Sequence, residues 1–259
     1  MVTILDKIID NKIIEIEAQK EKVSLNNLLL TKRNRKRYSL KENLLKSGSS
    51  GIIAEFKRKS PSKNWINKDA VSSEIVLGYE KAGASGSSIL TDTNFFGGTQ
   101  NDLIEAGEIV KLPILRKDFI VDEYQIIEAD KMGADVILLI AACLTPQKVK
   151  ELTKIARINN LEVLLEIHNE KELEYICDDI TMVGVNNRDL HTFTTNIETS
   201  VNLSKLIPDN FVKISESGIV NSDDVKYLKT HGFKGFLIGE SFMKTNNPGI
   251  ACKNFIEEL

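Results

Sequence analysis

The chain repeats one unit along most of its length, a short apolar run followed by a longer stretch with helical periodicity. The eight apolar runs are IIAEF, SSILT, PILRKDF, DVILLIAAC, EVLLEIH, TMVGVNN, FVKISES and GFLIGES. The helical stretches that follow them are residues 70–81, 101–110, 123–132, 147–158, 170–176, 199–206, 222–230 and 250–258. Strands that are apolar at nearly every position and are joined by helices form a parallel sheet that is buried on both faces.

Eight strand–helix units within residues 51–259 predict an α/β fold, the closed (β/α)₈ or TIM barrel. An open doubly wound sheet is the alternative, but no G-x-G-x-x-G follows the first run to support dinucleotide binding. We expect residues 1–259 to form a single domain, in which residues 1–50 are a helical extension and residues 51–259 the barrel. In the extension, apolar residues at helical spacing predict an amphipathic helix over residues 4–16 that lies across one end of the barrel.

The charges of the chain nearly balance, with 34 basic against 37 acidic residues and a formal net charge of −3. This balance gives no field over the whole molecule that would attract nucleic acid or a membrane surface, so we expect neither as a partner. The basic run from Lys32 to Arg37 is interpreted as a solvated segment. No apolar run approaches the roughly 18 residues that a membrane-spanning helix needs.

The cysteines and histidines match no metal-ligand spacing. They are Cys143, Cys177, Cys252, His168, His191 and His231. Scattered thiols are typical of a reduced, cytoplasmic protein. Isolated imidazoles and thiols predict no transition-metal site. We therefore expect a cytoplasmic protein that holds no metal.

Polar side chains stand at the carboxyl ends of several predicted strands, where barrel enzymes gather their chemistry. They are Glu55, Lys57, Lys117, Glu166, Asn186, Arg188 and Glu216. Any one of these charges is as readily part of a structural ion pair as of a functional site. Because the pattern recurs on several strands, it favours one shared site at the mouth of the barrel.

Strand parity places these side chains above the packed interior of the barrel. Residues two apart in a strand share a face, so Glu55 and Lys57 point the same way as Ile53. The same rule pairs each later charge with an apolar residue below it: Leu115 with Lys117, Leu164 with Glu166 and Ile214 with Glu216. Pro61 removes a ladder donor, so the first strand should run into a loop after Lys57.

The last two strands end in small residues with accessible backbone N–H groups. The stretches are SESG, from Ser215 to Gly218, and IGES, from Ile238 to Ser241. The loops after strands seven and eight are where barrels commonly hold phosphate. The pair of stretches predicts a phosphate site, with the Glu240 side chain turned away from the anion.

Six motifs in order resemble those of the indole-3-glycerol-phosphate synthase family. They are AEFKRKSPS, PILRKDFI, EVLLEIHNE, VGVNNRDL, SESGI and FLIGESFM. The resemblance runs along the whole chain and implies a TIM barrel of tryptophan biosynthesis without metal or organic cofactor. It implies the conversion of 1-(o-carboxyphenylamino)-1-deoxyribulose 5-phosphate into indole-3-glycerol phosphate, carbon dioxide and water.

Carried over motif by motif, the resemblance also implies residue roles. The implied catalytic residues are Lys117, Glu166, Lys57, Glu55, Asn186 and Glu216. The implied substrate contacts are Arg188, Ser217, Ser60, Pro61 and Phe119, with Phe95 or Phe96 as a further ring of the apolar slot for the anthranilate. The implied phosphate contacts are Lys57, Ser217, Gly218, Gly239 and Glu240.

A mechanism follows from these roles as a hypothesis. Lys117, oriented and kept charged by Glu55, is the expected general acid at the ketone of the substrate, and Glu166 the expected base in the loss of water. The small-molecule phosphorylated substrate is the expected ligand, and no obligatory protein partner is evident.

The residues leave two alternative functions open. One is another phosphate-binding barrel, such as an isomerase that acts on a phosphoribosyl aminoketose. The other is a barrel that only binds a phosphorylated ligand and regulates a partner. Two lysines and two acids around one pocket favour an enzyme over a pure binder.

Overall fold

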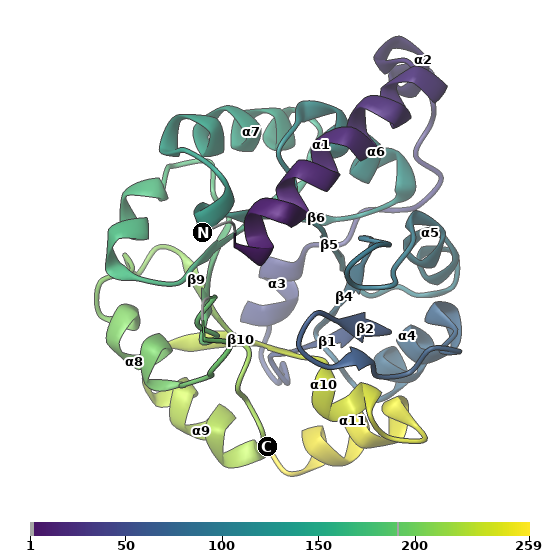
Figure 1. Cartoon of the computed structure of the whole chain (residues 1–259). Coiled ribbons are helices and arrows are strands. Elements are labelled where there is room, and N and C mark those ends of the chain that lie inside the picture. Colours follow the sequence, from purple (N-terminus) through teal and green to yellow (C-terminus); the bar gives the residue numbers. More distant parts are fainter. Residues whose placement is uncertain (1–2, 191) are drawn as a thin grey trace.

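Eight parallel strands close into a barrel in the computed structural model, which describes residues 3–190 and 192–259 (Figure 1). The strands are β1 (Ile52–Phe56), β4 (Gly86–Leu90), β5 (Ile114–Lys117), β6 (Val136–Ile140), β7 (Glu162–Ile167), β8 (Met182–Asn186), β9 (Val212–Glu216) and β10 (Phe233–Ile238). Each strand pairs with the next along the chain, and β10 returns to β1 with Leu237 opposite Ile53. The predicted (β/α)₈ barrel is therefore confirmed, and the alternative prediction of an open doubly wound sheet is wrong.

Helices follow the strands around the outside of the barrel. They are α4 (Ser72–Lys81), α5 (Gln100–Ile109), α6 (Glu123–Met132), α7 (Pro146–Ile158), α8 (Glu198–Ser204), α9 (Ser222–Thr230), α10 (Glu240–Met243) and α11 (Pro248–Glu257), with the 3₁₀ helices η1 (Ala141–Cys143) and η2 (Glu170–Tyr175). The stretch predicted as a helix over residues 170–176 is thus a 3₁₀ helix, and η1 and α10 were not predicted. None of the helices in the described ranges is long and apolar enough to span a bilayer.

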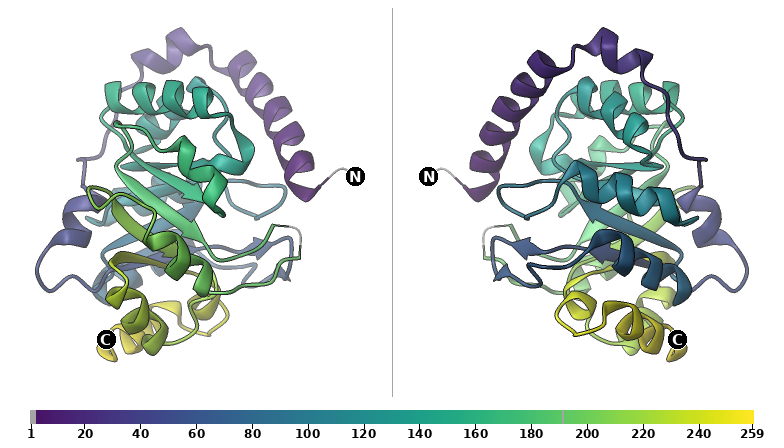
Figure 2. Two further views of the ribbon diagram at one scale, coloured as in Figure 1. Left: turned by 90° about the vertical axis from the view of Figure 1, so that its left-hand side faces the viewer. Right: turned by 90° about the vertical axis from the view of Figure 1, so that its right-hand side faces the viewer.

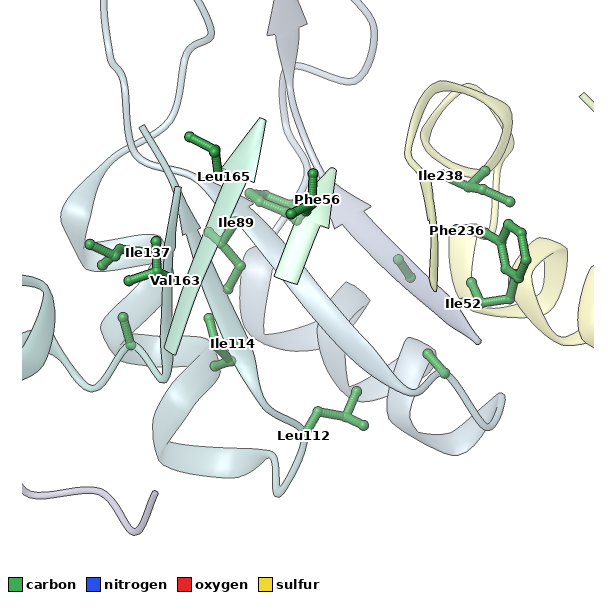
Figure 3. Packing of buried hydrophobic residues seen from close by; sticks show 14 of the residues in the cluster. Ile52, Phe56, Ile89, Leu112, Ile114, Ile137, Val163, Leu165, Phe236 and Ile238 are labelled. Atoms are coloured by element: carbon green, nitrogen blue, oxygen red, sulfur yellow. The ribbon is translucent and has the colours of Figure 1, made fainter. Parts of the chain in front are cut away.

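The alternation of side chains along the strands separates two apolar layers. Ile53, Leu115, Leu164 and Ile214 belong to one buried cluster inside the barrel, as strand parity predicted. The alternate positions pack outward against the helices, and Figure 3 shows this outer layer around Ile114. Because both strand faces are buried, the strands are apolar at almost every position.

The amino-terminal extension reaches both ends of the barrel (Figure 2). It consists of α1 (Ile4–Lys22), α2 (Leu25–Leu30) and α3 (Leu40–Leu45). Thr3 caps α1, which continues to Lys22, beyond the predicted end at residue 16. Helix α1 lies at the end that carries the hairpin of β2 (Lys59–Ser60) and β3 (Asn64–Trp65), and α3 lies at the opposite end.

The interpretation of the basic run as a solvated segment is wrong for Arg33 and Arg35, whereas Lys32 and Lys36 are exposed as expected. Arg33 and Arg35 have side chains only 8% and 9% exposed, and both pair with Asp135. Arg33 Nη2 lies 2.6 Å from Asp135 Oδ1, and the same guanidinium donates to the carbonyl oxygens of Gly133 and Ala134. A carboxylate beside the free carbonyl groups at the carboxyl end of a helix attracts cations, which is why the side chains of Arg33 and Arg35 are buried. The division into a 1–50 extension and a 51–259 barrel of one domain stays a prediction.

Candidate active site

A cavity of about 680 Å³ opens at the carboxyl ends of the strands. Every residue predicted for the site lines it: Glu55, Lys57, Ser60, Pro61, Lys117, Phe119, Glu166, Asn186, Arg188, Glu216, Ser217, Gly218, Gly239 and Glu240. These residues come from six strands or the loops after them, β1, β5, β7, β8, β9 and β10, so their meeting is a product of the barrel topology.

Lys117 is the central cation of the cavity. It ends β5, and its Nζ lies 3.3 Å from Glu166 Oε2 and donates a short hydrogen bond to Glu216 Oε2. Burial lowers the pKa of the Lys117 ammonium, but the carboxylates of Glu216 and Glu166 outweigh burial and raise that pKa above its usual range. Lys117 is therefore held as an ammonium group.

Glu166, at the end of β7, is held as a carboxylate. Burial raises its pKa, but the charge of Lys117 and the contacts of His168 and Asn186 outweigh burial, so the pKa falls below its usual range. Asn186 Nδ2 donates to Glu166 Oε1 at 3.0 Å. The second carboxylate oxygen, Oε2, faces Lys117.

Sequence reasoning missed His168 by treating it as isolated. Its Nε2 lies 3.3 Å from Glu166 Oε1, and its Nδ1 lies 3.3 Å from Glu172 Oε2. Burial lowers the pKa of His168, but the two carboxylates outweigh burial and raise it to about 10. The signal that could have found this residue is its position two residues after Glu166.

Glu216 differs from the other acids. Its Oε1 is buried and has no hydrogen-bond partner among the described residues. Burial and the nearby carboxylates of Glu166 and Glu55 outweigh Lys117 and raise the pKa of Glu216 to about 7. Lys117 cannot fully neutralise Glu216 because the same ammonium also faces Glu166.

This burial predicts that Glu216→Gln stabilises the protein above neutral pH. A folded-state pKa raised from 4.5 to about 7 gives stability that is complete below about pH 4.5 and is lost as pH rises through 7. At pH 8, urea unfolding should show the variant more stable by roughly 1–3 kcal/mol, with the gain disappearing at pH 4.5. Glu240→Gln, at an exposed acid of the cavity rim, is the control. The same stability difference at both pH values would contradict a raised pKa.

Glu55 does not orient Lys117 as predicted. Its Oε1 instead accepts from Lys57 Nζ at 2.5 Å, while Lys117 contacts Glu166 and Glu216. Glu55 still adds a smaller electrostatic contribution to the raised pKa of Lys117. The expectation that Glu55 and Lys57 share a face is confirmed, and the pair forms a second ionic group beside the first.

Small residues also line the cavity. Ser217 and Gly218, after β9, have left-handed φ values of +66° and +73°. Gly239 precedes the short α10 after β10, and a Cβ added there would lie 2.5 Å from Glu55 Oε1. A side chain at Gly239 would therefore disturb Glu55. The Glu240 side chain is 40% exposed, with its Oε1 3.9 Å from Lys63 Nζ at the rim.

Apolar groups form the remaining wall. The rings of Phe96 and Phe119 lie 5.9 Å apart, centroid to centroid, and both line the cavity together with Pro61. Of the two predicted alternatives, Phe96 lines the cavity. Helix α1 adds Ile4, Leu5 and Ile8, and the loop after β8 adds Leu190 and Phe193. The apolar stripe of α1 was visible in the sequence, but the surface that it covers was not.

The described residues contain no group of three or more His, Cys, Asp or Glu side chains placed to hold a metal ion. His191 lies outside the described ranges.

Fold and cavity together define a TIM-barrel protein with a charged cavity at the carboxyl ends of its strands. The family model of indole-3-glycerol phosphate synthase matches residues 5–255. The chain is 49% identical to the indole-3-glycerol phosphate synthase of Bacteroides thetaiotaomicron over the full length of both, and 42% identical to that of an Acinetobacter baumannii strain over 95% of this chain and 92% of the relative. The chain belongs to the indole-3-glycerol phosphate synthase family, which consists of decarboxylating lyases of tryptophan biosynthesis that act on a phosphorylated small molecule.

Solved structures confirm the fold. A chain of the tryptophan synthase complex of Pyrococcus furiosus superposes with a TM-score of 0.62 at 16% identity, over 82% of this chain and 98% of that one. The 3-hexulose-6-phosphate synthase of Salmonella typhimurium superposes with a TM-score of 0.63 at 11% identity, over 80% and 97%. At these identities the likeness shows the barrel alone.

Proposed function

We propose that the cavity closes the indole ring of 1-(o-carboxyphenylamino)-1-deoxyribulose 5-phosphate, with Lys117 as general acid and Glu166 as general base. The observation that carries this proposal is the contact of the Lys117 ammonium with the Glu166 carboxylate in one cavity. An acid and a base that keep opposite charges side by side suit a reaction that needs proton delivery and proton removal in turn.

Ring closure begins when the aromatic carbon attacks the ketone. The ketone oxygen gains negative charge, and a proton from Lys117 neutralises it. A positioned general acid contributes roughly 10²–10⁴-fold to the rate. Glu216 and Glu166 keep Lys117 charged between turnovers. Holding the two carbons in contact, between the aromatic wall and the ionic groups, lowers the entropic part of the barrier.

Loss of the carboxylate and of water then restores aromaticity. Arg188 steadies the substrate carboxylate before it leaves as carbon dioxide. Its backbone N–H donates to Asn186 Oδ1 at 3.0 Å, which ties the Arg188 loop to the residue that holds Glu166. Glu166 removes the ring proton, and Lys57 or Lys117 protonates the leaving hydroxyl. Ser60, at the end of β2, and the adjacent Pro61 line the cavity and contact the substrate.

The phosphate of the substrate lies at the end bordered by Lys57, Ser217, Gly218, Gly239 and Glu240. Small residues let backbone N–H groups approach an anion closely. Lys57 supplies the positive charge, and its pairing with Glu55 sets the position of the ammonium.

We predict that Gly218→Ala raises KM for the substrate and the inhibition constant of inorganic phosphate together, each by about 10-fold or more, because a side chain at φ +73° forces the backbone to move. The added Cβ would also lie 3.0 Å from Thr195 Cβ. Gly48→Ala is the matched control, since Gly48 has φ +75° and open space around it. An unchanged phosphate inhibition constant in a folded Gly218→Ala protein would place the phosphate elsewhere.

The activity itself is tested by incubation of the purified protein with the substrate. Indole fluorescence should appear together with stoichiometric carbon dioxide. Binding without carbon dioxide release would favour the regulatory barrel, and conversion without release would favour an isomerase.

We also propose that the enzyme uses no metal or organic cofactor, needs no nucleic-acid or obligatory protein partner, and is located in the cytoplasm. Activity that survives exhaustive treatment with a chelator would support the proposal that no metal is needed.

A further inference from the structure

A lysine outside the catalytic groups is fully buried in an ionic cluster. Lys12, on α1, has a side chain only 1% exposed. Its Nζ lies 2.9 Å from Asp118 Oδ1, 3.2 Å from Asp92 Oδ2 and 2.9 Å from Glu15 Oε2. Lysine is almost never fully buried unless it is paired, and breaking such a pair leaves a buried charge without compensation.

The carboxylates that hold Lys12 also hold the backbone of the aromatic wall. Asp92 Oδ1 accepts from the backbone N–H groups of Phe95 at 2.8 Å and Phe96 at 3.3 Å. Asp118 Oδ1 accepts from the backbone N–H of Phe119 at 2.8 Å. Phe96 and Phe119 are the two rings that face each other in the cavity.

The face of α1 that carries Lys12 also faces the cavity. Ile8 lies one helical turn before Lys12 and lines the cavity. The ion pairs of Lys12 therefore fix the position and rotation of this face of the helix. Asn94 Nδ2 donates to Asn11 Oδ1 at 3.1 Å, a second link between α1 and the loop that carries Phe96. Lys12 is therefore the point at which three separate pieces of the apolar wall meet: α1, the loop after β4 and the end of β5.

We propose that Lys12 is a positioning residue for the aromatic half of the substrate, because its ionic cluster with Asp92 and Asp118 locks α1, Phe96 and Phe119 into one apolar wall. The proposal rests on the proposed function, which assigns that wall to the anthranilate ring. It adds a specificity determinant that touches neither the substrate nor the proton-transfer groups.

The electrostatics support a permanent charge cluster. Burial lowers the pKa of Lys12, but Asp118, Asp92 and Glu15 outweigh burial and raise it above the usual range. Burial raises the pKa of Asp118, but Arg116 and Lys12 outweigh burial and lower it to about 2. The other charged group of this cluster is Glu128, whose Oε2 lies 2.8 Å from Arg116 Nη2.

The test compares two ligands that both carry a phosphate group, of which only one also carries an aromatic ring. Inhibition constants of indole-3-glycerol phosphate and of inorganic phosphate are measured for the full chain and for Lys12→Met. We expect the constant for indole-3-glycerol phosphate, and KM for the substrate, to rise about 10-fold or more, since the variant loosens large apolar side chains. The constant for inorganic phosphate should stay within about 3-fold.

Lys20→Met is the matched control. Lys20 is on the same helix and pairs with Asp122 at 3.0 Å, but it does not line the cavity. It should leave both inhibition constants unchanged. If Lys12→Met fails to fold in a thermal melt, Asp92→Asn replaces it. This variant keeps an oxygen for the Phe95 and Phe96 N–H groups and replaces the oxygen that faces Lys12 with an uncharged amide group. It should again weaken indole-3-glycerol phosphate more than inorganic phosphate.

Equal weakening of the two ligands, or no weakening of either in a folded variant, would overturn the proposal. Its failure is distinguishable from failure of the proposed function. Turnover by the unaltered chain tests the function, whereas only the difference between the two ligands tests Lys12.

Discussion

Lys117→Met should lower kcat by about 10³-fold or more while KM stays within a few-fold of the unaltered enzyme, because the lost proton donor acts only in the transition state. Methionine keeps an unbranched apolar side chain as far as Cε and removes the ammonium group that contacts both Glu166 and Glu216. The measurement is steady-state fluorescence of the indole product over a range of substrate concentrations.

The control for this variant is Lys213→Met. Lys213 is also a buried strand lysine, but its Nζ donates to Ser204 O at 2.8 Å on the outer side of the barrel. We expect this change to lower stability and leave kcat nearly unaltered. If Lys117→Met kept near-normal kcat, Lys117 would not be the acid.

Glu166→Gln should lower kcat by roughly 10²–10⁴-fold, the usual contribution of a positioned general base. Glutamine still offers an oxygen to Asn186, so the loss reflects proton removal more than a changed shape. Single-turnover measurements should then show carbon dioxide release ahead of indole formation, since Glu166 acts after the carboxylate leaves. Loss of both steps together would move Glu166 to the first step.

Glu162→Gln tests the same substitution at the other end of the same strand. Glu162 accepts from the backbone N–H groups of Leu40 at 2.9 Å and Lys41 at 3.2 Å, far from the cavity along β7. It should change stability without changing kcat. A fall in kcat equal to that of Glu166→Gln would show that the effect comes from a damaged strand.

The barrel and the placement of the site residues could be predicted because both depend on local periodicity. Strand parity put Lys117, Glu166 and Glu216 above Leu115, Leu164 and Ile214, and parallel strands must end at the same side of a closed sheet. The family motifs then identified which polar residues to group. The roles of these residues stay predictions.

The ion pairs between different strands of the barrel could not be predicted from the sequence. Spacing shows that Glu55 and Lys57 are neighbours, but the partners of Lys117 lie 49 and 99 residues further along the chain. Arg33 and Arg35 of the basic run were misread for the same reason, because their partners are set by tertiary packing and composition gives only the commoner outcome, a solvated side chain. His168 is a different case, since its partners Glu166 and Glu172 are close in sequence and only their spacing was overlooked.

The burial of Arg33 also constrains the order in which the protein can fold. Its partner Asp135 lies 102 residues downstream, and the partners of Arg35 lie 72 to 100 residues downstream. Contacts this distant in sequence carry a large loop-closure penalty and form late. A ribosome must therefore release about half of the polypeptide before its first fifty residues can dock, and until then that leading segment is open to proteases and chaperones.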